Sequence, residues 1–176
     1  TSANAWLQTI YTNKDWGFEA GIRFDGNYNS IIQSPTNPTT FNGIGNWYLK
    51  KQIEKLEVQG GYIYEQYGSG IALRCFEERS LGIDNAIFGV KAKYQLTEAI
   101  TAKAIAGVQK YRLGQFESFI KGVNIGASKE INEDLGINSE ISVVNRTLAP
   151  DYRNTLDKEI SNYDQAHYFA TPYNTV

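Results

Sequence analysis

A group of ionisable side chains with complementary charges lies between residues 65 and 84 of the sequence. It places two guanidinium groups among four carboxylates, namely Glu65, Arg74, Glu77, Glu78, Arg79 and Asp84. An Arg guanidinium is planar and pairs with a carboxylate through two parallel hydrogen bonds, so this composition favours a compact ion-pair network. We expect a loop that is held in this way to charges elsewhere in the fold, such as Lys91, Lys93 or Arg23. The alternative is that Arg74 and Arg79 bind an anionic solute or the carboxylates of a partner.

The sequence contains few residues that could carry out catalysis. His167 is the only histidine and Cys75 the only cysteine, so a histidine-rich metal site or an internal disulfide cannot form. Glu77 and Glu78 are adjacent and would point to opposite faces of a strand, so they could not act on one glycosidic bond. Gly68-Ser69-Gly70 lacks the lysine of a phosphate loop, and we interpret it as a bend where a strand becomes a loop. We therefore expect no catalytic residue, no metal and no cofactor.

The elements that would position these charges have a period of two. Residues 16–24 alternate between an apolar set on one parity, led by Trp16, and a set of glycines and charges on the other. Successive side chains of a β-strand point to opposite faces, so this segment predicts a strand with one apolar and one polar face. The same pattern returns along the chain.

The repeated alternation predicts four hairpins. Their strands are expected at about 3–12 and 16–27, 43–51 and 56–65, 88–94 and 100–108, and 119–128 and 135–143. Short polar turns near residues 14, 53, 97 and 131 join the strands of each pair. We expect longer loops at 28–40, 67–84 and 146–176.

Two kinds of all-β fold alternate in this way, and they differ in what the apolar face contacts. A soluble sandwich or lipocalin-like barrel turns it inward, whereas an outer-membrane barrel turns it toward lipid around a polar interior. Short turns at one rim and longer loops at the other are typical of outer-membrane barrels. A nine-residue apolar stripe, at ~3.3 Å per residue and a tilt of ~40°, also covers roughly the ~25 Å apolar band of such barrels. Glycines beside charges of both signs on the polar face suit a crowded, hydrated interior.

We therefore predict an all-β, antiparallel up-and-down transmembrane β-barrel. Residues 1–176 form a single barrel domain or the N-terminal part of one, with about eight strands. Eight strands could close a small barrel, but we favour part of a larger one. The chain begins at Thr1, contains no Met and ends without the aromatic residue common in a final barrel strand, so we expect further strands.

This prediction places the apolar side chains of each strand against lipid and the polar side chains in the interior of the barrel. The side chains expected to face lipid are Trp16, Phe18, Ile22, Phe24, Val58, Tyr62, Phe88, Val90, Val108, Ile137 and Ile141. The charges expected to face the lumen are Glu19, Arg23, Glu57, Lys91, Lys93, Lys103 and Glu140.

The overall composition excludes one class of function. Seventeen basic and nineteen acidic residues give a net charge of -2. The basic residues form no block, which argues against nucleic acid as a partner. Twelve Tyr and three Trp suit half-hydrated surfaces such as membrane interfaces.

The charged stretch also carries a family resemblance. It contains Tyr-Glu-Gln-Tyr-Gly-Ser-Gly at 64–70, Arg-Cys-Phe-Glu-Glu-Arg at 74–79 and Leu-Gly-Ile-Asp-Asn at 81–85. In these motifs the chain resembles a family of Bacteroidota outer-membrane β-barrel proteins of unassigned function, strongly over residues 56–94 and in outline over about 3–145. The resemblance implies a barrel in the outer membrane of a diderm bacterium and a full-length protein longer than this chain. It implies no reaction.

Three functions are compatible with these patterns. We favour a non-enzymatic structural or accessory subunit of an outer-membrane assembly, with outer-membrane lipid and other outer-membrane proteins as partners. The second is a passive channel or solute transporter, which conductance would distinguish from the first. The third is a soluble carbohydrate-binding β-domain that uses Tyr and Trp as stacking platforms, for which release by high salt without detergent is expected.

Overall fold

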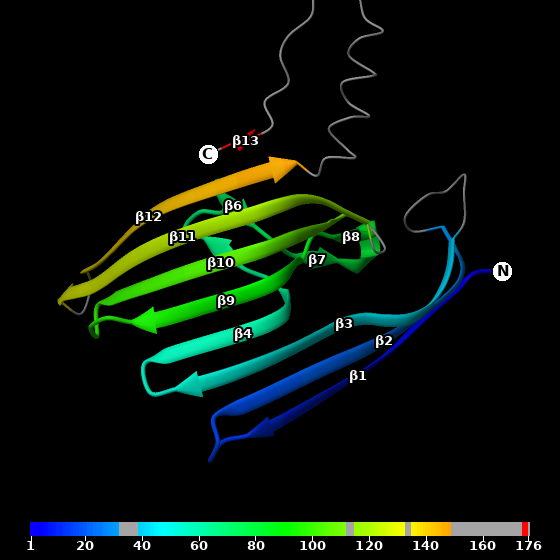
Figure 1. The fold of residues 1–176 in the computed structure, drawn as a ribbon, viewed down its shortest axis with the longest axis horizontal. Coiled ribbons are helices and arrows are strands. Elements are labelled where there is room, and N and C mark those ends of the chain that lie inside the picture. Colours follow the sequence, from blue (N-terminus) through cyan, green and yellow to red (C-terminus); the bar gives the residue numbers. More distant parts are fainter. Residues whose placement is uncertain (32–38, 112–114, 133–134, 149–173, 176) are drawn as a thin grey trace, which may run out of the picture.

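The main sheet of the structure is antiparallel, and its strands lie side by side in the order in which they occur along the chain. The computed structural model describes residues 1–31, 39–111, 115–132, 135–148 and 174–175. The sheet has the order β1-β2-β3-β4-β9-β10-β11-β12-β13 (Figure 1). Its strands are β1 Ala3–Asn13, β2 Phe18–Ser30, β3 Thr39–Ile53, β4 Leu56–Ile63, β9 Ile87–Gln95, β10 Ile100–Tyr111, β11 Gln115–Asn132, β12 Leu135–Leu148 and the two-residue β13 Asn174–Thr175.

The predicted antiparallel all-β fold is therefore confirmed. The turns that join β1 to β2, β3 to β4 and β9 to β10 lie at the same end of the sheet (Figure 1). Within the described residues the sheet is open, with β1 at one edge and β13 at the other. A closed barrel thus stays a prediction.

The first hairpin turn differs from the prediction. Trp16 lies in the turn, and β2 begins at Phe18. Gly17 has a φ of +58°, and a Cβ at this position would lie 2.6 Å from the carbonyl oxygen of Gln52. The apolar and polar alternation continues through this turn, so periodicity alone could not place it.

Several strands are longer than the alternation indicated. β3 begins at Thr39, within the predicted loop 28–40, and β12 continues to Leu148. Polar residues and glycines such as Asn42 and Gly43 also pair with β2, so β3 extends beyond the segment in which apolar residues alternate. The remainder of that loop, at 32–38, and nearly all of the predicted loop 146–176 lie outside the described residues.

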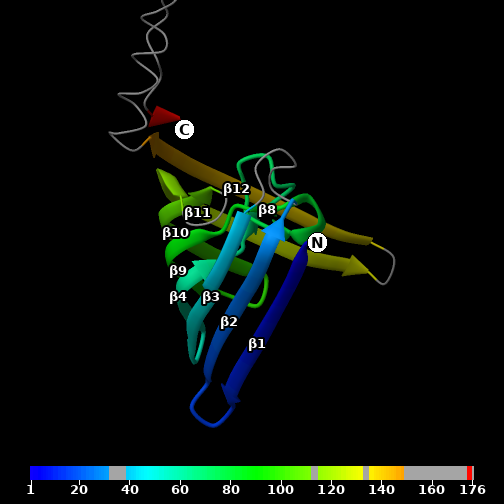
Figure 2. The same ribbon diagram turned by 90° about the vertical axis from the view of Figure 1, so that its right-hand side faces the viewer.

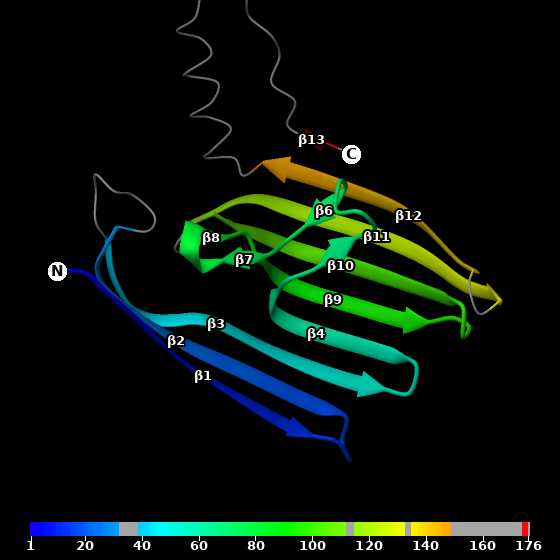
Figure 3. The ribbon, with the colours of Figure 1, turned by 180° about the vertical axis from the view of Figure 1, so that it is seen from behind.

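The ladder registers separate two faces. We call the face of Phe24, which pairs with Ile44, the outer face, and the face of Arg23, which pairs with Asn46, the inner face. Residues 64–86, between β4 and β9, lie against the inner face (Figure 3), and we call them the insert. The predicted loop 67–84 is thus a folded segment, with β5 Gln66–Tyr67, β6 Leu73–Arg74, β7 Glu77–Glu78, β8 Ile83–Asp84 and the 3₁₀ helix η1 Arg79–Leu81.

The sheet is curved around the insert (Figure 2). Three glycines form a row across adjacent strands, because Gly61 pairs with Gly89 and Gly89 pairs with Gly107. A Cβ on Gly89 would lie 2.1 Å from the carbonyl oxygen of Ala106 and 2.5 Å from the Cα of Gly107. The absence of side chains therefore permits the strands to coil tightly here.

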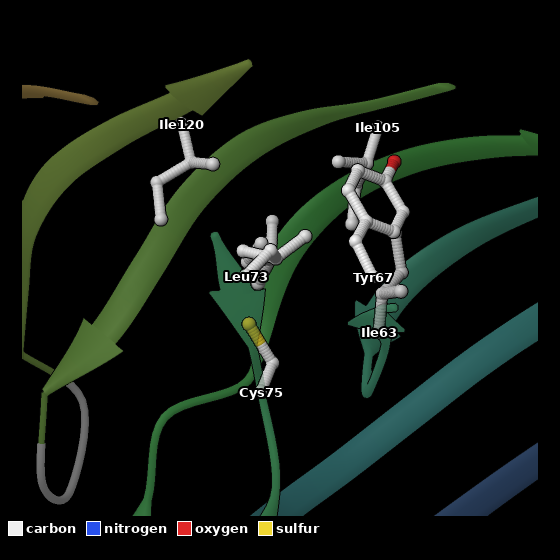
Figure 4. Packing of buried hydrophobic residues seen from close by; sticks show 7 residues of the cluster. Ile63, Tyr67, Leu73, Cys75, Ile105 and Ile120 are labelled. Carbon is white, nitrogen blue, oxygen red and sulfur yellow. The ribbon is translucent and has the colours of Figure 1, made fainter. Parts of the chain in front are cut away.

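The buried core lies between the insert and the inner face. It contains Ile63, Tyr67, Leu73, Cys75, Ile87, Ile105 and Ile120 (Figure 4). Ile63, Ile87, Ile105 and Ile120 come from β4, β9, β10 and β11 respectively, and Tyr67, Leu73 and Cys75 come from the insert. The inner face is thus apolar where these four isoleucines meet the insert.

Candidate functional site

The insert contacts strands at both sides of the sheet. At the β12 side, the backbone N–H of Gly68 donates to Glu140 Oε2 at 2.7 Å. At the β2 side, Arg23 Nη1 lies 2.7 Å from Glu77 Oε2. The guanidinium of Arg79 stacks 4.5 Å from the ring centroid of Trp6 on β1. A short segment therefore connects the first strands of the sheet to β12.

Arg23 is the centre of the ion pairs at the β2 side. Its Nε and Nη2 donate to the two carboxylate oxygens of Asp25 at 2.8 and 3.0 Å. The side chain of Arg23 is only 7% exposed, and Glu77 Oε1 also lies 3.2 Å from Arg79 Nε. Arg23 and Asp25 are two residues apart on one strand, so alternation places them on the same face. The guanidinium is thereby matched by two carboxylates.

Asp84 anchors the C-terminal part of the insert. Lys110 Nζ lies 2.5 Å from Asp84 Oδ2, and the hydroxyl of Tyr64 donates to Asp84 Oδ1 at 3.1 Å. Asn46 Nδ2 on β3 donates to the Tyr64 hydroxyl at 3.2 Å. Burial, followed by the charge of Asp84, raises the pKa of Tyr64. The phenol therefore remains a neutral hydrogen-bond donor.

Glu65 binds the insert to the middle of the sheet. Its carboxylate lies 3.2 Å from Lys91 Nζ and 3.1 Å from Lys103 Nζ. Burial disfavours the charged form, but the two ammonium groups outweigh this effect, so the pKa of Glu65 is lowered. Lys91 also lies 3.7 Å from Glu57.

The structure thus brings together most of the predicted charges, but not all. Arg74 is exposed, and its guanidinium lies 4.9 Å from the ring centroid of Phe76. Glu78 instead caps η1, where its Oε1 accepts from Ser80 N at 3.3 Å. Lys93 is exposed, and none of the ion pairs among the described residues includes it. Glu19 lies outside the network too and pairs with Lys50 at 3.0 Å.

Sequence reasoning missed three members of the network. Asp25 could have been found, because it continues the parity of Arg23. Lys110 follows a register shift between Gln109 and Lys110, and a bulge of this kind changes the face to which later side chains point. Trp6 lies opposite Asp25, and only the pairing of β1 with β2 places it beside the insert.

The site has no reactive arrangement within the part of the chain that the structure describes. The described residues contain no group of three or more His, Cys, Asp or Glu that could hold a metal ion. Cys75 is buried, and burial raises the pKa of its thiol to about 11, so the reactive thiolate is scarce at neutral pH. His167 lies outside the described residues. The carboxylates of the insert serve instead as acceptors for cations and N–H groups.

The outer face has the opposite character. Every predicted lipid-facing residue except Trp16, which is in the turn, lies on this face, as the pairs Val58 with Ala92 and Ile125 with Ile141 illustrate. Ile141 is 76% exposed, Val90 59% and Phe24 47%. Phe18, Ile22, Tyr62, Phe88 and Val108 are half-buried, and the rings of Tyr62 and Phe88 lie 5.1 Å apart between centroids. Lys121 is an exception, since it shares this face and its Nζ lies 5.4 Å from the ring centroid of Phe119.

The described residues contain no helix that is long and apolar enough to cross a membrane. A search of the curated proteins and a search of the solved structures each gave no match. The sequence model of DUF6029, a family of unknown function, matches residues 1–171. The chain therefore belongs to the DUF6029 family.

Proposed function

We propose that this chain forms part of a β-barrel in the outer membrane of a Bacteroidota bacterium, as a structural or accessory subunit without catalytic activity. Outer-membrane lipid and other outer-membrane proteins are its proposed partners. The observation that carries the proposal is the distribution of polarity across the sheet: ion pairs lie on the inner face, and large apolar side chains are exposed on the outer face.

This distribution is the reverse of what a water-soluble β-domain requires. Such a domain places its apolar parity in the interior and exposes its charges. Here Arg23 and Lys110 are each 5% exposed, whereas Leu7, Val90 and Ile141 are at least 59% exposed. Contiguous apolar patches of this kind mark a contact with lipid or with another protein. A sheet that alternates lipid-exposed and interior residues fits a barrel wall.

The motifs that resemble the Bacteroidota family support the same proposal. Several of their members make the contacts described above: Glu65 pairs with Lys91 and Lys103, Glu77 with Arg23, and Asp84 with Lys110. The motifs thus correspond to a segment that is folded against the inner face, rather than to an external binding loop.

A channel is the second candidate function, and one observation favours it. The part of the inner face near the hairpin turns is not covered by the insert and carries Lys50, Glu57 and the exposed Lys93. Such residues suit a water-filled vestibule. A soluble carbohydrate-binding domain has less support, because its stacking aromatics would share an exposed face with many aliphatic side chains.

Spin labels on opposite faces of β9 test the orientation. Val90→Cys is on the outer face and Lys93→Cys on the inner face, and both are made with Cys75→Ala and reconstituted into lipid vesicles. We expect label 90 to collide mainly with dissolved oxygen, which concentrates in lipid, and label 93 mainly with a water-soluble nickel chelate. Equal access of both labels to the nickel chelate, or release of the unmodified protein from membranes by high salt alone, would contradict the proposal.

A further inference from the structure

We infer that the insert, residues 64–86, is a plug that seals the interior of the barrel against solutes. This inference rests on the proposed function and extends it, because it makes the resting barrel non-conducting. Three observations carry it: the reach of the insert across the sheet, its dry packing, and the placement of its ion pairs.

The insert reaches most of the strands that would form the wall. From the β1 side to the β12 side, its partners are Trp6, Arg23, Asn46, Lys91, Lys103, Gly122 and Glu140. These residues belong to β1, β2, β3, β9, β10, β11 and β12. A segment that served only as an external loop would have no reason to contact both ends of the sheet. The curved sheet instead holds the insert across its concave side, as Figures 2 and 3 show.

The contact between insert and sheet excludes water. Ile63 and Ile87 are fully buried, and Tyr67 and Ile120 are 1% and 2% exposed. The Tyr67 hydroxyl donates to the carbonyl oxygen of Gly122 at 3.4 Å. Among the described residues, no buried side-chain nitrogen or oxygen lacks a hydrogen-bond partner. Around these residues, the surface between insert and sheet is therefore packed rather than open.

The spaces beside the insert differ in size. A pocket of about 140 Å³ remains between the insert and β1–β2, lined by Trp6, Arg23, Arg79 and Lys110 among others. That volume holds a few waters, at roughly 30 Å³ each. A larger hollow of about 770 Å³ lies between the insert and β10, β11 and β12, and is lined by Arg74, Gln109, Ile120 and Arg146 among others. The insert thus closes the side facing β1–β9 more tightly than the side facing β10–β12. In the proposed barrel, the strands that complete the wall would lie beside the larger hollow.

Two ion-pair clusters hold the plug, and the chain offers a matched control for them. The double variant Glu65→Gln and Glu77→Gln removes the charges that bind Lys91, Lys103 and Arg23. Glu78→Gln is the control, because Glu78 is adjacent and exposed and its carboxylate accepts from Ser80 in the same segment. All variants are made in the full protein.

Conductance across planar lipid bilayers is the first measurement. We expect no steady conductance from the wild type or Glu78→Gln, and opening events from the double variant. Steady wild-type conductance would overturn the seal while leaving a membrane barrel intact. Failure of the wild type to enter bilayers or vesicles at all would instead overturn the proposed function, and the seal with it.

Labelling of Cys75 is the second measurement, and it does not depend on conductance. Cys75 is a residue of the insert, is 4% exposed and lies in the core between the insert and the sheet. A small water-soluble maleimide should label it slowly in the wild type and about tenfold faster in the double variant, since ~1.4 kcal/mol of easier local opening is a tenfold change. Wild-type labelling as fast as in denaturant would overturn the plug. So would a double variant that labels faster but never conducts.

Discussion

The row of glycines across β4, β9 and β10 leads to a specific prediction about how closely these strands approach each other. In Gly89→Ala, the new methyl group would lie 2.1 Å from the carbonyl oxygen of Ala106 and 2.5 Å from the Cα of Gly107. Ordinary contacts of a Cβ begin near 3.4 Å. Both neighbours are backbone atoms, so the β9–β10 ladder has to move by more than 1 Å, and no side-chain rotation can relieve the clash.

The expected cost follows from this geometry. Overpacking a well-packed site costs about 1–3 kcal/mol, and we place Gly89→Ala at the upper end because backbone must shift. Gly60→Ala is the control: this residue is on the outer face of β4, one position before Gly61, and a Cβ there meets nothing within 4 Å. Replacing an unstrained glycine by alanine within a strand stabilises it by roughly 0.5–1 kcal/mol. The two variants should therefore differ by about 2–4 kcal/mol.

The assay is urea-induced unfolding of the protein in detergent micelles or lipid vesicles, followed by tryptophan fluorescence and by the migration of unheated samples in gels. We expect Gly89→Ala to unfold at clearly lower urea and Gly60→Ala at or slightly above the wild-type midpoint. Equal midpoints for the two variants would refute the reasoning. They would mean that β9 and β10 do not approach each other as closely as the row of glycines permits.

Two further predictions concern the charges of the inner face. Arg23→Met should destabilise the fold by about 3–5 kcal/mol in the same unfolding assay, because it leaves Asp25 and Glu77 without their buried partner. The side chain of Lys50 is 32% exposed, so Lys50→Met should cost less than about 1 kcal/mol. Comparable losses of stability in the two variants would contradict the assigned role of Arg23. The lowered pKa of Glu65 means that the folded state holds this proton less tightly, so its contribution to stability is present above the ordinary pKa of 4.5 and is lost as the pH falls through the lowered value. Unfolding measured between pH 2 and 6 should show a shallower acid loss in Glu65→Gln than in the wild type, and parallel curves would exclude the proposed pairing with Lys91 and Lys103.

The sequence was informative where structure is periodic. The parity of residues 18–24 predicted the two faces of β2, because alternation is inherent in an extended strand. The turn was misplaced at Trp16, since a positive φ at Gly17 leaves no trace in an alternation pattern. The partners of the insert depend on the register of distant strands and on the bulge before Lys110, so a charge count could predict an ion-pair network but not its pairs.

The four isoleucines of the inner face explain why the insert and the sheet depend on each other. Ile63, Ile87, Ile105 and Ile120 share the parity of the charges, and without the insert they would face water in the proposed barrel. Burying each such side chain contributes about 1.5–3 kcal/mol, and the insert provides the cover through Tyr67 and Leu73. Removing the insert would expose an apolar patch on the inner face and would leave Arg23 without Glu77 and Lys110 without Asp84. Lipid contact stabilises the outer face in the proposed orientation, but it cannot cover the inner one. The insert is therefore the part of this chain that gives the sheet an interior, and variation within its motifs should affect the stability of the whole sheet rather than that of a surface loop.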